Sequence, residues 1–180
     1  MRIVAGERKG TRLAAPAGRA ARPTSDRVRE SLFAILADVA DAAVLDPFAG
    51  SGALGLEALS RGAATVVFCD VDGAALAAVR ENARRLRYAD RCTVRRQDAR
   101  RRFAADRGAG VTYDLVLLDP PYAMLAALHP QLEADLPALL APGGRAVLER
   151  PAGEPAPAPD LDVVAERAYG GTAITVWRRG

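Results

Sequence analysis

The sequence predicts an α/β fold with a mostly parallel β-sheet, and two observations carry this expectation. Short apolar runs alternate with helical stretches from Ala43 to Glu149, which is typical of parallel strands joined by helices on both faces of a sheet. The chain has 180 residues, of which 50% are hydrophobic. It is therefore long and apolar enough for one domain with a core of its own.

The first element is expected to be a basic β-hairpin extension at residues 1–20. Two short strand-like runs, residues 2–5 and 11–14, flank the turn-forming segment Gly6–Gly10. We expect this hairpin to precede the main domain as a separate extension.

The main, Rossmann-like domain is expected over residues 21–180, and it begins with a helix. Thr24, Ser25 or Asp26 can cap this helix, and its apolar spacing continues to about Ala40.

After this helix, strands and helices alternate until the last two strands. Pro130 and Pro137 are expected to interrupt the last helix, and Pro142-Gly143-Gly144 is expected to form a turn. No helix separates the last two strands, so they must pair as a hairpin, and the seven-stranded sheet ends with an antiparallel strand. The expected strands are 43–46, 65–70, 92–96, 114–119, 145–149, 161–169 and 173–178, and the expected helices are 53–61, 73–86, 100–106 and 125–140.

Composition excludes several classes of protein. No apolar stretch approaches the ~20 residues that span a bilayer, and the N-terminus has no apolar core of signal-peptide length, so we expect a cytoplasmic protein without membrane contact. The two cysteines, Cys69 and Cys92, are too few for a disulfide scaffold or a zinc site and should lie at opposite ends of the sheet. His129 is the only histidine. One histidine offers little basis for a histidine-based metal site or a Ser-His-Asp triad, and we expect no metal.

Positive charge gathers in two parts of the chain. The first thirty residues hold eight basic and three acidic groups, and residues 80–102 hold ten arginines against three acids. Much of the second block is explained by a solvated helix face. Lys9 is the only lysine, so nearly all the cations are guanidinium groups, which pair with phosphate in a bidentate manner. The N-terminal block therefore predicts a phosphate-binding surface.

A glycine-rich turn follows the first strand of the main domain. Gly50, Gly52 and Gly55 fit the pattern G-x-G-x-x-G, in which glycine lets a ligand approach the backbone closely. Asp70 ends the next strand, where an acid can accept hydrogen bonds from ribose hydroxyls. These features indicate an adenosine cofactor without saying which one.

Two further acids separate the possible cofactors. Asp46 ends the first strand, where an anion would repel a pyrophosphate and favour a ligand that carries a sulfonium and an amino group, as S-adenosylmethionine does. Asp98 follows the third strand and can accept the adenine amino group. Each acid alone can instead be a turn or cap residue, but together they occupy the edge at which α/β sheets bind ligands. The cofactor-binding candidates are Asp46, Phe48, Gly50, Ser51, Gly52, Asp70, Val71, Asp98, Ala99 and Asp119.

The catalytic candidates are Asp119, Pro120, Pro121 and Tyr122, which follow the apolar run Leu115–Leu118. The carboxylate of Asp119 and the carbonyl of Pro120 can accept the two hydrogens of an amine, because the prolines fix the backbone there. Tyr122 offers a flat face on which an extruded base can stack. This combination suits methyl transfer to an exocyclic amino nitrogen.

These motifs resemble those of a known family. The segments Asp46–Gly52 and Asp119–Tyr122 look like the cofactor and catalytic motifs of class I amino-methyltransferases. The chain is further similar to the RsmD family over nearly its whole length, in the opening Arg2–Gly6 with Lys9-Gly10, the pre-core signature Arg22–Phe33, the helix Ala53–Ala63 and the C-terminal segment Tyr169-Gly170-Gly171-Thr172.

The resemblance implies the class I S-adenosylmethionine-dependent methyltransferase fold and a specific activity. RsmD enzymes methylate N2 of one guanine in a hairpin loop of small-subunit ribosomal RNA, acting on assembled or nearly assembled subunits. The expected cofactor is S-adenosyl-L-methionine, the expected partner is 16S rRNA in the small ribosomal subunit, and we expect a monomer. The RNA-binding candidates are Arg2, Arg8, Lys9, Arg12, Arg22 and Arg27.

Four other functions stay open at this point. An adenine-N6 DNA methyltransferase uses a similar tetrapeptide but normally needs more sequence to recognise its site. A protein glutamine methyltransferase fits less well with the basic N-terminal segment. An NAD-dependent dehydrogenase fits the bare glycine pattern, but Asp46 and the Asp119–Tyr122 tip oppose it. The fourth is an RNA-binding module without activity.

Overall fold

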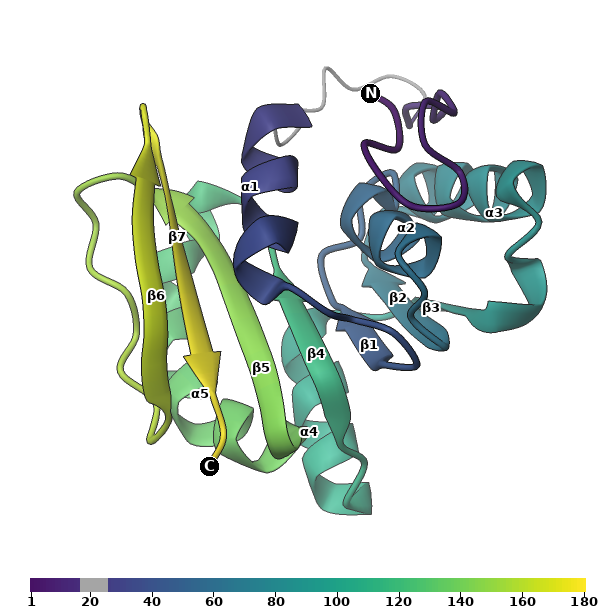
Figure 1. Ribbon diagram of the computed structural model, residues 1–180. Coiled ribbons are helices and arrows are strands. Elements are labelled where there is room, and N and C mark those ends of the chain that lie inside the picture. The colour runs from purple at the N-terminus through teal and green to yellow at the C-terminus, as the bar shows by residue number, and fades with distance from the viewer. Residues whose placement is uncertain (17–25) are drawn as a thin grey trace.

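A seven-stranded sheet forms the centre of the molecule in the computed structural model, which describes residues 1–16 and 26–180 (Figure 1). The strand order is β3-β2-β1-β4-β5-β7-β6, and only the pairs that involve β7 are antiparallel. The predicted fold is therefore confirmed, with β7 inserted between β5 and β6. The elements are α1 (Asp26–Leu36), β1 (Ala43–Asp46), α2 (Ala53–Ser60), β2 (Thr65–Asp70), α3 (Gly73–Leu86), a short 3-10 turn (Ala89–Arg91), β3 (Cys92–Arg96), α4 (Ala99–Ala109), β4 (Tyr113–Leu118), α5 (Tyr122–Leu139), β5 (Leu140–Pro151), β6 (Asp162–Tyr169) and β7 (Thr172–Arg178).

Helices cover both faces of the sheet because the central strands are apolar on both sides. Val44 packs into the core beneath α1, α2 and α3, whereas its neighbour Leu45 packs into the core beneath α4 and α5. Leu115 and Val116 of β4 alternate in the same way, since successive side chains of a strand point to opposite faces. Figure 1 shows α4 and α5 behind the sheet, on the far side from α1.

The N-terminal segment forms a short, irregular hairpin in place of two full strands. One antiparallel bridge, between Arg2 and Arg12, closes it, and the amides of Ile3, Gly10 and Leu13 donate across it to the carbonyls of Thr11, Ile3 and Met1. The amide groups of Val4 and Ala5 instead donate to the carboxylate of Glu57 on α2, at 2.8 and 3.0 Å. This distant side chain therefore attaches the end of the first run to α2.

Several element bounds differ from the sequence expectation, and three differences have a clear physical setting. Helix α1 ends at Leu36, earlier than predicted, because Ala37 adopts a left-handed φ of 55°. Helix α5 continues through Pro130 and Pro137. The predicted turn at Pro142–Gly144 lies inside β5, where the pairing with β4 shifts register.

Other expectations about the chain can be compared with the described residues. Cys92 pairs with Val66 and Cys69 with Arg95, so the two cysteines lie at opposite ends of the sheet, as predicted. The predicted caps Thr24 and Ser25 lie outside the described residues. Within the described ranges, no helix is both long enough and apolar enough to cross a bilayer.

Candidate active site

A cavity of about 550 Å³ opens at the carboxyl ends of the parallel strands. Its wall contains most of the predicted site residues, from both the cofactor and the catalytic groups. Those that line it are Phe48, Gly50, Asp70, Val71, Asp98, Ala99, Asp119, Pro120, Pro121 and Tyr122. Sequence reasoning missed four further lining residues, Pro47, Gln97, Met124 and Glu149.

The glycine loop is tied to the second strand through Asp70. The amide of Gly50 donates to Asp70 Oδ2 at 2.9 Å, and the amide of Asp72 donates to Oδ1 at 2.9 Å. Gly50 and Gly52 have φ values of 51° and 82°, a region that glycine adopts without a steric penalty. Asp70 therefore shapes the loop as well as facing the cavity.

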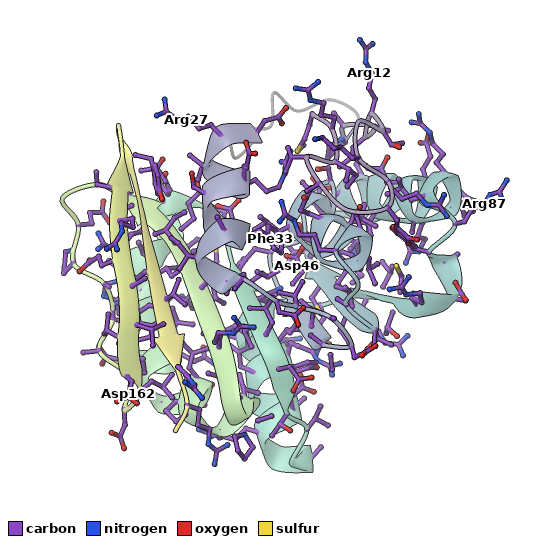
Figure 2. The ribbon with its side chains drawn as sticks, in the orientation of Figure 1. Arg12, Arg27, Phe33, Asp46, Arg87 and Asp162 are labelled. Atoms are coloured by element: carbon purple, nitrogen blue, oxygen red, sulfur yellow. The ribbon has the colours of Figure 1, made fainter. Side chains whose placement is uncertain are left out.

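Asp46, labelled in Figure 2, is buried in the interior and does not line the cavity. Its carboxyl group is 1% exposed and accepts a hydrogen bond from the amide of Gly55 at 3.1 Å. Burial, followed by repulsion from Asp119 and Asp70, raises the pKa of Asp46 to about 7. Three acids therefore lie close enough to repel one another, which makes this end of the cavity favourable for a cation.

Asp98 and Val71 supply a polar and an apolar part of the same wall. Asp98 caps α4 by accepting hydrogen bonds from the amides of Arg100 and Arg101, at 2.9 and 3.4 Å. Asp98 is therefore a helix cap, which was the alternative role considered for it. Both capping bonds are made by Oδ1, and not by Oδ2. Val71 is 60% exposed and lines the cavity, where an aliphatic side chain suits the face of a planar ligand.

The predicted catalytic tetrapeptide, Asp119–Tyr122, forms the connection between β4 and α5. Asp119-Pro120-Pro121 follows the last residue of β4, and Tyr122 is the first residue of α5. The hydroxyl of Tyr122 lies 3.2 Å from Thr172 Oγ1 at the start of β7. The segment Tyr169–Thr172, singled out in the sequence, thus lies beside the tetrapeptide and holds the tyrosine ring by its hydroxyl.

Two predicted cofactor residues, Ser51 and Gly52, do not line the cavity. The carbonyl of Ser51 accepts a hydrogen bond from Asn82 Nδ2 at 3.0 Å, and Gly52 precedes the first residue of α2. Asn82 is fully buried and also exchanges hydrogen bonds with the backbone of Ala14. This asparagine on α3 therefore joins the N-terminal segment to the glycine loop, a role with no local signal in the sequence.

The basic N-terminal candidates differ in how far they are available to a partner. Arg12 and Arg27 point into solvent in Figure 2, and Lys9 is also exposed. Arg2 is exposed but pairs with Asp26 at 3.1 Å, and Arg8 lies over the ring of Tyr88, 5.7 Å from its centroid. Arg22 lies outside the described residues.

Comparison with known proteins gives this geometry a family context. A family model described as "Conserved hypothetical protein 95" matches residues 1–178. The Bacillus subtilis (strain 168) protein "Putative rRNA methyltransferase YlbH" is 36% identical over 99% of both chains. "Ribosomal RNA small subunit methyltransferase D" of Escherichia coli (strain K12) is 43% identical, over 68% of this chain and 60% of that protein.

Solved structures agree with the family match. "Putative methyltransferase yhhF from Escherichia coli" superposes with a TM-score of 0.83 at 35% identity, covering 99% of this chain and 97% of that one. An RNA methyltransferase from Salinibacter ruber, solved with S-adenosyl-L-homocysteine, shares the fold with a TM-score of 0.64 at 23% identity, covering 87% and 92%. The predicted fold is thereby confirmed, and the methyltransferase relatives of 36% and 43% identity bear out the predicted cofactor, S-adenosylmethionine.

Proposed function

The chain belongs to the RsmD family of S-adenosylmethionine-dependent rRNA methyltransferases, and we propose that it methylates the exocyclic N2 of a guanine in 16S rRNA. The proposed substrate is the small ribosomal subunit, and the proposed active form is a monomer in the cytoplasm. The observation that supports this proposal most strongly is that Asp119, Pro120 and Tyr122 line one cavity together with the strand-end acids Asp70 and Asp98.

The cofactor would occupy the part of the cavity beside β1, β2 and β3. Asp70 would accept from ribose hydroxyls, Asp98 from the adenine amino group, and Val71 would cover the adenine face. When bound, S-adenosylmethionine supplies an electrophilic methyl group on a positively charged sulfur. Asp46 would act from below, since its ionised form favours a cation above it.

The target amine would lie at the end of β4. An exocyclic guanine amine is a poor nucleophile because its lone pair is delocalised into the ring. If the Asp119 carboxylate and the Pro120 carbonyl each accept one amine hydrogen, the lone pair is directed away from both and toward the methyl carbon. Such alignment and electrostatic complementarity can supply most of the rate enhancement without a metal.

Tyr122 would hold the base once it has left its stack. Base-modifying enzymes read a target nucleotide outside the helix, and stacking on an aromatic ring contributes about 1–3 kcal/mol per base. The bond between the Tyr122 hydroxyl and Thr172 limits the ring to one orientation, so the stacking face is prepared before RNA arrives.

The RNA backbone would contact exposed basic residues near the cavity. Figure 1 shows the N-terminal segment and the start of α1 at the same end of the molecule as the carboxyl end of β5. Lys9, Arg12 and Arg27 are exposed there, and guanidinium groups bind phosphate in a bidentate manner.

Substitution of Asp119 tests the catalytic part of the proposal. The Asp119→Asn variant should bind S-adenosylmethionine with nearly wild-type affinity by calorimetry, but methyl transfer should fall about 10²–10³-fold, as when other prepared electrostatic contacts are removed. Asp114→Asn is the matched control, because Asp114 lies at the other end of β4 and accepts from the Ala43 amide at 2.8 Å. Transfer by Asp119→Asn at the rate of the control would refute the catalytic assignment.

A further inference from the structure

A second carboxylate stands beside Asp119 at the substrate end of the cavity. Glu149, near the end of β5, is 6% exposed and lines the same cavity as Asp119 and Tyr122. Leu118 of β4 pairs in parallel with Leu148 of β5, so Asp119 and Glu149 each follow the last paired position. Neighbouring strands lie about 4.8 Å apart, and residues in register point to the same face. The two carboxylates therefore emerge side by side.

The tyrosine ring is directed toward the same place. Tyr122 begins α5, and its hydroxyl is bonded to Thr172. Thr172 pairs with Pro151, two residues beyond Glu149 on β5. The ring therefore reaches from the end of β4 toward the end of β5 and the start of β7, and a base stacked on it would present its edge between Asp119 and Glu149.

The next residue on β5, Arg150, does not line the cavity and makes its contacts within the sheet. Arg150 Nε donates to Thr175 Oγ1 at 3.3 Å, and its guanidinium pairs with Glu166 on β6. Adjacent residues of a strand face opposite sides. Arg150 thus secures the edge of the sheet, while Glu149 faces the cavity.

We propose that Glu149 accepts a hydrogen bond from N1–H of the target guanine and so selects guanine over adenine. This inference rests on the proposed function and names the residue that sets its specificity. The Watson–Crick edge of guanine carries the N2 amine beside N1–H, so it offers donors to two neighbouring acceptors. In adenine the ring nitrogen beside the amine is an acceptor, which an ionised carboxylate repels because a carboxylate can only accept.

The test removes the N1–H group from the substrate base and, separately, the charge from Glu149. Small subunits are assembled with 16S rRNA that carries either guanosine or 2-aminopurine riboside at the nucleotide that the wild-type protein methylates. 2-Aminopurine keeps the amine but has an unprotonated N1 and no O6. The wild-type protein should prefer guanosine by at least about 100-fold in kcat/KM, since a site built to bind an N–H group rejects an analogue that lacks it.

The Glu149→Gln variant should reduce that preference to less than about tenfold, because a glutamine amide can donate to the unprotonated N1 of 2-aminopurine. The loss of O6 affects both proteins equally, so the change in the ratio isolates the N1 contact. Glu154→Gln, in the exposed loop after β5, should keep the wild-type ratio. If Glu149→Gln is unstable in thermal melting, Glu149→Asp replaces it; this variant should lose kcat/KM for guanosine but keep the direction of the preference.

Three outcomes are distinguishable. A reduced preference in Glu149→Gln supports the inference. An unchanged preference, with N2-methylguanosine still formed, overturns the inference and leaves the proposed function standing. Methylation of adenine N6 by the wild-type protein, in place of guanine N2, overturns both.

Discussion

The buried carboxylate of Glu57 anchors the N-terminal segment, and its replacement by glutamine tests that anchoring. Oε2 accepts from the Val4 amide at 2.8 Å, and Oε1 accepts from the Ala5 amide at 3.0 Å and from Arg61 Nε at 2.8 Å. Arg29, which is also fully buried, lies 3.8 Å away. Both oxygens thus face N–H donors, so a glutamine amide must turn its own NH2 group toward a donor in either orientation.

The expected loss of stability follows from these contacts. Breaking one partner of a buried charge network typically costs about 3–5 kcal/mol, because the remaining charge stays buried without compensation. With a urea m-value of about 2 kcal/mol/M, Glu57→Gln should lower the unfolding midpoint by about 2 M. Trypsin should also cleave the N-terminal segment after Lys9 or Arg12 before the rest of the chain unfolds, since the segment has lost its main attachment.

Glu81→Gln is the matched control for this experiment. Glu81 lies on the exposed face of α3, where a charge change has little effect on stability, typically within about 0.5 kcal/mol. If Glu57→Gln and Glu81→Gln unfold at the same urea concentration and resist trypsin equally, Glu57 does not hold the N-terminal segment in the way the structure indicates.

Three other substitutions examine the cofactor and RNA surfaces. Because burial raises the pKa of Asp46 to about 7, the folded state binds this proton more tightly than the unfolded chain does, and stability falls as pH rises from about 4 to about 7. Asp46→Asn should therefore be more stable than the wild type at pH 8, by at most about 4 kcal/mol, and the gain should vanish at pH 4 in urea unfolding; an equal effect at both pH values contradicts this. Asn82→Ala, which frees the glycine loop and the N-terminal segment from one another, should raise the calorimetric Kd for S-adenosylmethionine several-fold, and an unchanged Kd argues against this coupling. The double variant Lys9→Glu/Arg12→Glu should reduce the salt dependence of RNA binding by about two phosphate contacts, whereas Arg101→Glu, exposed on α4, should leave it unchanged; equal slopes for the two variants remove the N-terminal segment from the RNA surface.

The elements that local pattern decides were predictable from the sequence. Helix Gly73–Leu86 and strand Cys92–Arg96 have the predicted bounds. In both, the spacing of apolar residues and the residues that begin and end the element indicate the same range. Elements that depend on distant partners were not predictable. Residues 2–5 read as a strand by composition, but Glu57 on another element accepts hydrogen bonds from the amides of Val4 and Ala5. Helix α5 continues through two prolines because its leucines pack into the core on both sides of them.

In the site too, residues marked by the local sequence were predictable, and residues placed by distant contacts were not. Asp70, Asp98 and Asp119 were recognisable because each lies at or just after the carboxyl end of a strand, and strand ends converge at one edge of a parallel sheet. Glu149 also ends a predicted strand, 145–149, but its place near Asp119 depends on the register between β4 and β5, which the sequence does not give. Asn82 likewise looks like an ordinary helix residue until the fold brings Ala14 and the glycine loop to it.

The most direct measurement of the central claim is the identity of the methylated nucleotide. The protein is incubated with labelled S-adenosylmethionine and small subunits from a strain that lacks the enzyme, and the labelled RNA is digested to nucleosides and mapped. We predict a single labelled nucleoside, N2-methylguanosine, at one position of 16S rRNA. Label in N6-methyladenosine, in free DNA or in a ribosomal protein would contradict the account.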